Sequence, residues 1–409
     1  MLLLLLSTFM ACGQRPLASQ PAALAATSAK SASRDPGTAV EPAASTQNPS
    51  FIMVEGPNLK SKLEAAIKQA RAGSPPTRFW TAYSFDVRSG VAVDPGNLQF
   101  NGTMETYGGT TVFIGTSNGM TVETRNLGVF LLHEPTGDDI ARVEVYNLER
   151  RREYSGYPVY WAGRVGNEES LNYLKAIMDS TAPETNRLAD RAAFAIALHD
   201  DAQVESILTS LIRRPIAEPI RSRAIYWLGY TPESQTKNAF LIEIIRNDRE
   251  WSEPRQQAMS ALGMSRMAAT LPLLENLYET MTSRDLRQRA LGGIARNDNR
   301  DGAASYLIPI AANEKDLELR KGAISGLGRI PGEKSLGALT NLVESDPDPE
   351  MQKQAVRAIA RRSRDEAIPI LIRIARSHPK MPVRKQAIQV LGQTGDERAV
   401  ALFTELLNK

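Results

Sequence analysis

The feature that most constrains the fold is an apolar pattern that recurs about every 32 residues along the second half of the chain. Its register is set by seven alanines: Ala192, Ala224, Ala258, Ala290, Ala323, Ala355 and Ala387. A larger apolar residue follows four positions after each alanine, and a small residue follows five positions after it. These offsets place the apolar groups on one face of a helix. The small residue permits a tight turn or a close approach of the next helix.

A second apolar helix is expected after each of these helices, as at residues 367–371 and 399–403. A fixed period with two helices per unit is typical of a solenoid, in which each unit buries its apolar face on its neighbours. The chain is therefore predicted to be mostly α. We expect an α-α superhelix over residues 166–409, with seven repeats and a capping helix, preceded by a small antiparallel β-rich domain.

Arginine recurs three positions before the register alanine, and an acid recurs near the start of the same helix. The arginines are Arg221, Arg255, Arg287, Arg320 and Arg384. The acids are Glu218, Glu253, Asp285, Asp316 and Asp348. An acid at a helix start satisfies free N–H groups, and arginine can bind such a carboxylate through two hydrogen bonds. We interpret the arginines as a structural ladder between repeats; a binding site for a partner is the alternative.

The pattern is clearest at residues 384–392 (Arg-Lys-Gln-Ala-Ile-Gln-Val-Leu-Gly), followed by Asp-Glu-Arg-Ala-Val at 396–400. It resembles HEAT repeats of the short bilin-lyase-like kind. Two enzyme groups share such repeats: the bilin lyases, and deoxyhypusine hydroxylase, whose di-iron centre uses several His-Glu pairs. In the predicted solenoid, neither His199 nor His378 precedes a glutamate, so the resemblance does not extend to the iron ligands.

Residues 51–165 read as the β-rich domain with one N-terminal helix at 60–71. Short aromatic and β-branched runs, separated by glycine-containing turns, indicate strands. A hairpin is expected around Asn118-Gly119, and another between residues 129–132 and 140–146. His133-Glu134 lies at a predicted strand end, where we expect no metal site.

Four aromatic residues precede the first repeat: Tyr154, Tyr157, Tyr160 and Trp161. We interpret them as an apolar contact between the sheet and the solenoid. An exposed aromatic platform for a ligand is the alternative.

The N-terminal end of the chain resembles a bacterial lipoprotein signal. Residues 1–12 comprise a short apolar run that ends in Ala-Cys, with Cys12 as the expected lipidation site. Residues 13–50 are rich in Ala, Ser and Pro, which predicts a disordered tether. The expected location is the cell envelope, either anchored through a lipid or periplasmic.

The near balance of 49 basic and 46 acidic residues argues against a nucleic-acid partner. A basic cluster at Arg361, Arg362 and Arg364 adjoins acids and is interpreted as a solvated helix end. One cysteine and three distant histidines indicate neither a metal nor another cofactor. Motifs of nucleophile elbows, phosphate loops and zincin helices are missing from the sequence.

These observations favour a non-catalytic scaffold that binds a protein or an extended peptide through the solenoid. Two alternatives remain. The β-rich domain could be the module that binds a glycan or peptide, with the solenoid as a spacer. The chain could also be a lyase-like enzyme of the HEAT-repeat type, which predicts a deep pocket lined by ionisable groups.

Overall fold

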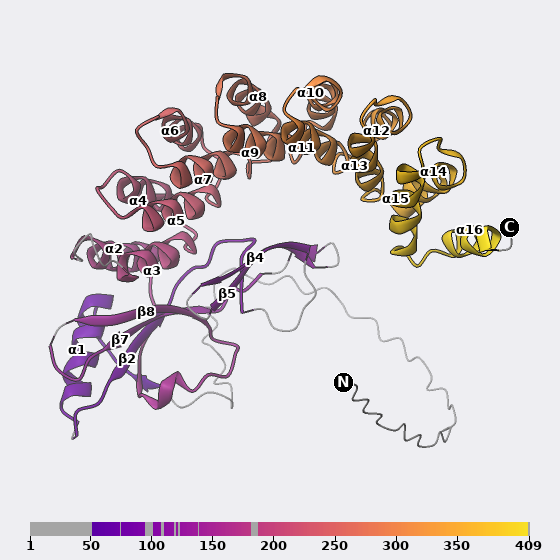
Figure 1. Ribbon diagram of the computed structural model, residues 1–409. Helices are drawn as coiled ribbons and strands as arrows, with labels where there is room; N and C mark the ends of the chain where they lie inside the picture. Colours follow the sequence, from indigo (N-terminus) through magenta and orange to yellow (C-terminus); the bar gives the residue numbers. More distant parts are fainter. Residues whose placement is uncertain are drawn as a thin grey trace, which may run out of the picture. The chain divides into compact units, whose positions relative to one another are not determined.

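The computed structural model describes residues 51–73, 75–94, 101–107, 110–117, 120–121, 123–137, 139–180 and 187–407. These described residues belong to one compact unit, in which a sheet is followed by an array of helices (Figure 1). The predicted mostly α fold is therefore confirmed. Cys12, the signal-like segment, the predicted tether and the Asn118-Gly119 turn lie outside the described residues.

The main sheet has five strands in the order β1-β9-β2-β7-β8. Their bounds are β1 Ile52–Met53, β2 Phe79–Ser84, β7 Leu127–His133, β8 Ile140–Asn147 and β9 Val159–Arg164. The predicted hairpin is confirmed, since β7 pairs antiparallel with β8. The sheet is nevertheless mixed, because β9 runs parallel to both β1 and β2. Strand periodicity specifies which face is buried and leaves the pairing partner open, so the expectation of a wholly antiparallel sheet was wrong for β9.

A second sheet has the order β3-β5-β4, with β6 paired to β5. These strands are β3 Ala92–Val93, β4 Asn101–Tyr107, β5 Thr110–Ser117 and β6 Met120–Thr121. β5 and β6 run antiparallel with Ser117 opposite Met120, on either side of the predicted Asn-Gly turn. Helix α1 (Leu59–Arg71) begins after Asn58, whose side chain accepts a hydrogen bond from Ser61 N at 2.9 Å.

Fifteen further α-helices follow among the described residues, besides two short 3-10 helices at Tyr154–Gly156 and Ala268–Thr270. They are α2 Asn167–Ser180, α3 Arg187–Ala197, α4 Gln203–Ile212, α5 Glu218–Gly229, α6 Gln235–Arg246, α7 Ser252–Leu262, α8 Leu271–Thr280, α9 Arg284–Ile294, α10 Arg300–Asn313, α11 Leu317–Leu327, α12 Glu333–Ser345, α13 Pro349–Ile359, α14 Arg364–Ser377, α15 Met381–Gly392 and α16 Glu397–Leu407. In Figure 1 the helices from α4 to α15 form two rows. We call α3, α5, α7, α9, α11, α13 and α15 the inner row, and the even-numbered helices from α4 to α14 the outer row.

All seven register alanines lie in the inner row and are at most 1% exposed. Of its two neighbours along the chain, each inner helix packs more extensively against the one that precedes it, so the pairs run from α2/α3 to α14/α15 and α16 follows the last pair. The sequence analysis placed the second helix after the register helix instead. Short links explain the difference: only residues 314–316 connect α10 to α11, and only 378–380 connect α14 to α15.

The small residue five positions after the register alanine allows neighbouring inner helices to approach closely. A Cβ atom on Gly263 would lie 2.9 Å from the Cα of Gly293 on the next inner helix. A Cβ on Gly328 would lie 2.7 Å from the carbonyl oxygen of Ala358. Both distances are shorter than side chains tolerate, so the close approach expected from the sequence is confirmed here.

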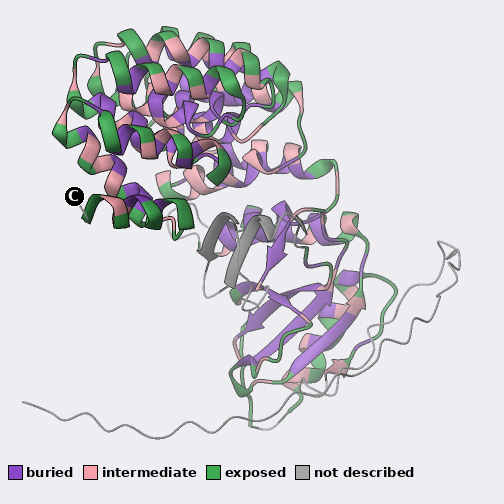
Figure 2. Cartoon of the chain, turned by 90° about the vertical axis from the view of Figure 1, so that its right-hand side faces the viewer, coloured by how far each residue is buried: buried purple, intermediate pink, exposed green. Residues whose placement is uncertain are grey.

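One continuous apolar core extends from Val54 in the sheet region to Leu402 in α16. Figure 2 shows the strands of the main sheet largely as buried residues, whereas the helices alternate buried and exposed faces. This core connects the sheet to the first helix pair and holds the inner row in place.

Candidate protein-binding surface

The recurring arginines lie at the junctions between successive helix pairs. Arg287 Nε donates to Tyr278 O of the preceding helix (3.2 Å), and its Nη2 donates to Glu314 in the next link (2.8 Å). Arg320 repeats this arrangement with Ala311 O (2.9 Å) and Asp346. Arg287 and Arg320 thus each connect the C-terminal end of the preceding outer helix to the loop between the two helices of the next pair.

The other three ladder arginines differ in their partners. Arg221 donates two hydrogen bonds to Glu250, of 3.0 and 2.8 Å, in the next link. Arg255 pairs instead with Asp248 of its own link at 2.9 Å. Arg384 donates to the carbonyl oxygens of His378 and Pro379.

The acids predicted to bind these arginines are not their partners. Asp316 and Asp348 accept backbone N–H groups at the starts of their own helices, and Asp316 also pairs with Arg284 at 2.5 Å. The arginine side chains reach link acids because helical side chains tilt toward the N-terminus, away from the following turn. Periodicity indicated the ladder but not which carboxylate would lie within reach.

One step of the arginine ladder is replaced by a histidine. Gln352 occupies the arginine position in α13 and is 2% exposed. His378, from the next link, comes within 2.9 Å of Val343 O through its Nε2. Val343 lies two residues before the end of α12, as Ala311 does in α10, where Arg320 is the donor. His378 therefore has a structural role.

A second polar network of partly buried side chains joins neighbouring inner helices. Arg289 on α9 donates to Gln256 (2.8 Å) and Ser260 (2.9 Å) on α7. Similar contacts are Arg223 with Asp190 (2.7 Å), Gln354 with Ser325 (2.6 Å) and Arg357 with Gln386 (2.9 Å). This network was not predicted from the sequence. Its signal is the Arg or Gln that directly precedes six of the seven register alanines.

At the junction of the sheet and the first helix pair, a buried hydrogen-bonded chain includes Tyr83, Ser170 and His199. His199 Nδ1 lies 2.8 Å from Ala195 O, which can only accept, so Nδ1 carries the hydrogen. Nε2 then accepts from Ser170 Oγ at 2.7 Å, and the Tyr83 hydroxyl lies 3.1 Å from the same oxygen. Burial lowers the pKa of His199 to about 4. All three side chains are at most 2% exposed, which excludes solvent from this Ser-His pair.

The four aromatic residues divide between two faces of the main sheet. Tyr160 belongs to the core that continues into the helices, as expected for a contact between sheet and solenoid. Tyr154 and Trp161 belong to a separate cluster with Trp80 and Phe130. Tyr154, Tyr160 and Trp161 are 3%, 7% and 5% exposed, so these three do not form an exposed platform. Tyr157 packs against the separate cluster and is partly buried.

The remaining candidates have structural partners. His133 Nε2 lies 2.9 Å from Thr81 Oγ1, and burial lowers the His133 pKa to about 4. Glu134 accepts two hydrogen bonds from Arg78 instead of facing a metal. Among the residues that the structure describes, no three potential metal-binding side chains come together. In the same residues, every helix is too short or too polar to cross a bilayer.

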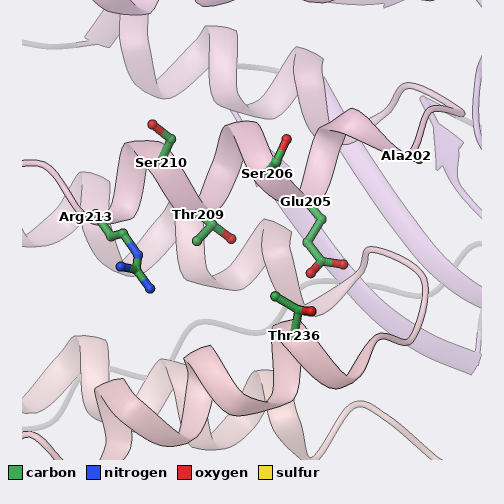
Figure 3. A pocket seen from close by; sticks show the side chains of 7 residues that line it. All are labelled: Ala202, Glu205, Ser206, Thr209, Ser210, Arg213 and Thr236. Carbon is green, nitrogen blue, oxygen red and sulfur yellow. The ribbon is translucent and has the colours of Figure 1, made fainter.

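A hollow of about 540 Å³ lies on the outer row, between α4 and the start of α6. Figure 3 shows the side chains that line it, which include Glu205, Thr209, Arg213 and Thr236. Ser234 donates to Glu205 (3.0 Å), and Arg213 pairs weakly with Glu243 (3.5 Å). The hollow is open to solvent, with Arg213 and Thr236 exposed at its rim.

Residues 337–409 match the family model of HEAT repeats, so the predicted resemblance is confirmed for this C-terminal segment. Human deoxyhypusine hydroxylase is similar at 14% identity, with 58% of this chain and 90% of that chain covered and a TM-score of 0.28. The complex of CpcE and CpcF of phycocyanin lyase from Nostoc sp. PCC7120 is similar at 15% identity, 58% and 92% coverage and a TM-score of 0.31. Similarity at these values carries no information about function. No curated protein matches the chain.

Proposed function

We propose that this protein is a non-catalytic scaffold that binds a partner protein through the exposed side of its inner helix row. The observation that carries the proposal is the second polar network. It repeats donors and acceptors along consecutive inner helices, and inter-repeat hydrogen bonds hold them in place. A fixed, extended and polar surface suits a protein or extended peptide better than a small molecule, which is usually enclosed in an apolar pocket.

The same proposal places the protein in the bacterial cell envelope. Support comes from the signal-like residues 1–12, the lipidation candidate Cys12 and the Ala/Ser/Pro-rich stretch that follows. In this arrangement the membrane is contacted only through the lipid. Labelling cells with a radioactive fatty acid tests the anchor: wild type should incorporate label and Cys12→Ser should not. Equal labelling of both would contradict it.

Binding by the inner row is tested with two matched pairs of substitutions in the full chain. Gln288 on α9 and Gln389 on α15 are exposed inner-row residues, and Q288R/Q389R adds bulk and charge there. Ser210 and Thr236 line the outer hollow, and S210R/T236R makes the same change there. We expect the inner pair to abolish capture of a defined envelope protein and the outer pair to leave it intact.

If only S210R/T236R abolished capture of the partner, binding would lie at the outer hollow. If both variants captured the partner normally, both surfaces would be excluded. A β-rich ligand module is not favoured, because three of its four candidate aromatic residues are buried. The lyase-like alternative would require turnover by the purified protein. Any turnover that survives removal of contaminating enzymes would contradict the scaffold proposal.

A further inference from the structure

The position six residues after each register alanine forms a row along one edge of the helix array. Its members are Leu198, Tyr230, Met264, Arg296, Arg329, Arg361 and Gln393. Three consecutive repeats therefore carry arginine. Each of these arginines lies two residues beyond the end of its inner helix, α9, α11 or α13. We call Arg296, Arg329 and Arg361 the edge arginines.

The edge arginines are exposed, unlike the arginines of the inter-repeat ladder, and they form none of the ion pairs found among the described residues. Arg296 has a weak contact of 3.4 Å with Gly263 O. Partial burial lowers the pKa of Arg296, and the nearby charges of Arg329 and Arg266 lower it further. The charge of Arg329 thus disfavours the protonated form of Arg296.

Three acids near this edge are paired with other cations. Asp298 lies 3.6 Å from Arg266 and 3.2 Å from Arg300. Glu366 pairs with Arg362 at 3.0 Å, and Asp365 pairs with Arg398 at 3.3 Å. Arg362 itself is buried and also donates to Ile330 O and Gly332 O, so it belongs to the fold and not to the row.

A contribution to folding stability explains only in part why arginine occurs at these three positions. A cation beyond a helix C-terminus interacts favourably with the helix dipole, and each edge arginine has this position. Repulsion between neighbouring arginines opposes that gain. The ladder arginines, by contrast, are neutralised by link acids such as Glu314 and Asp346. In three consecutive repeats the edge arginines thus carry positive charge that forms no ion pair with the described carboxylates.

We propose that the edge arginines bind an acidic, extended segment of the partner protein. Adjacent packed helices lie about 8–10 Å apart, and an extended chain in the polyproline II conformation rises about 3.1 Å per residue with three residues per turn, so every third side chain lies on the same face. A carboxylate at every third residue would therefore meet one arginine per repeat. Exposed side-chain amides of Gln288 and Gln389 lie on the same inner row and can bind the peptide backbone. This inference rests on the proposed function and specifies the chemistry of the partner.

A nucleic acid fits the row less well. Tight binding to DNA commonly involves about 6–10 phosphate contacts, whereas this row offers three arginines. The whole chain carries a formal charge of only +3. The arrangement accordingly favours a short acidic peptide segment, and single-stranded DNA serves as the competing probe.

The test measures binding of the full chain to two fluorescent peptides of identical composition. One has glutamate at every third position and serine between, and the other has its glutamates in one block. Fluorescence anisotropy at low salt should show tighter binding of the spaced peptide. R296Q/R329Q/R361Q should weaken that binding by about tenfold or more, as expected for loss of three exposed charge pairs. Glutamine is a conservative choice because Gln393 occupies this position in the last repeat.

The matched control is R213Q/R246Q/R373Q, which removes the same charge from exposed residues of the outer row. It should bind the spaced peptide as wild type does. Equal weakening by both triple variants, or no weakening by the edge variant, would overturn the inference. So would tighter binding of a single-stranded oligothymidine of equal charge that is lost in the edge variant.

The two proposals fail in different ways. If Q288R/Q389R abolishes capture of a protein but the edge variant binds both that protein and the peptides normally, only the acidic segment is excluded. If no protein is captured by any variant, the proposed function itself fails.

Discussion

Helix α3 and the later inner helices share one sequence register but have different neighbours. In α3, which packs beside the main sheet, every residue from Ala189 to Ala197 is buried. In α15, at the other end of the array, only Val383, Ala387, Val390 and Leu391 are buried. The register alanine and the large apolar residue four positions later are buried in both. Burial of the other positions in each helix depends on which element packs against that helix.

The residue directly before the register alanine shows this change most clearly. In α3 it is Arg191, which pairs with Glu144 of β8 and donates to Val143 O at 3.2 Å. In α9 it is Arg289, which bonds to polar side chains of α7 instead. The ladder position of α3 likewise carries a buried alanine, Ala189, in place of arginine. The comparison teaches that the periodic core specifies the array, while the polar positions specify what each helix contacts.

The largest effect should come from the ion pair that is unique to α3. Side chains of Arg191 and Glu144 are 10% and 6% exposed. Glu144→Gln should lower the free energy of unfolding by about 3–5 kcal/mol, because it leaves a buried guanidinium without its carboxylate. Urea unfolding followed by tryptophan fluorescence measures the change. The control is Glu344→Gln, which removes an exposed pair with Arg373; an equal loss in both variants would contradict a special role for α3.

The free energy of unfolding should also depend on pH, because of His199 at the junction of the main sheet and the first helix pair. Burial lowers the pKa of His199 from 6.5 to about 4. The unfolded chain therefore binds the proton first as pH falls. Stability from this group is complete above the unfolded pKa and is lost between about pH 6.5 and pH 4, at up to about 1.4 kcal/mol per pH unit.

His199→Asn should lower stability at pH 7 and reduce its loss between pH 7 and pH 4.5. Unfolding midpoints in urea at several pH values provide the measurement. His133, whose pKa is also lowered to about 4 by burial, adds a similar slope that this variant retains. An unchanged slope in His199→Asn would show that His199 is not neutral and buried in the folded state.

Close approach between the later inner helices predicts a smaller loss. Gly263→Val should lower the free energy of unfolding by about 1–3 kcal/mol, since the new side chain has no room beside Gly293. Gly337 provides the control, because a Cβ there would meet nothing within 4 Å. Gly337→Ala should raise stability by about 0.5–1 kcal/mol through helix propensity. Thermal unfolding by circular dichroism tests both signs, and a neutral Gly263→Val would contradict the tight spacing.

The ladder arginines should show the smallest of these losses. Arg287→Gln removes contacts with Tyr278 O and Glu314 and should cost about 1–2 kcal/mol. Arg373→Gln, whose partner Glu344 is equally exposed, should change stability by less than about 0.5 kcal/mol. Chemical unfolding compares the two variants directly. Equal losses of unfolding free energy in the two variants would show that a ladder arginine contributes no more than an ordinary surface ion pair.

The features that could be predicted from the sequence are those that depend on the spacing of residues within one helix. The register alanines, the large apolar residues after them and the close approach at Gly263 all follow from offsets within a single helix. Contacts that depend on chain direction or distant neighbours could not be predicted. β9 gave no signal of parallel pairing, and the link acids Glu314 and Asp346 were outside the helix-start pattern. The contact of His199 with Ser170 and Tyr83 joins three elements whose spacing in the sequence has no period.

Binding through the inner row is tested most directly by hydrogen–deuterium exchange of the full chain with and without its captured partner. The account predicts protection concentrated in the inner helices α9, α11 and α13 and in the links that carry Arg296, Arg329 and Arg361. The outer helices should exchange as they do in the free protein. Protection confined to the outer hollow around Glu205 and Arg213, or to the strands of the main sheet, would contradict the account.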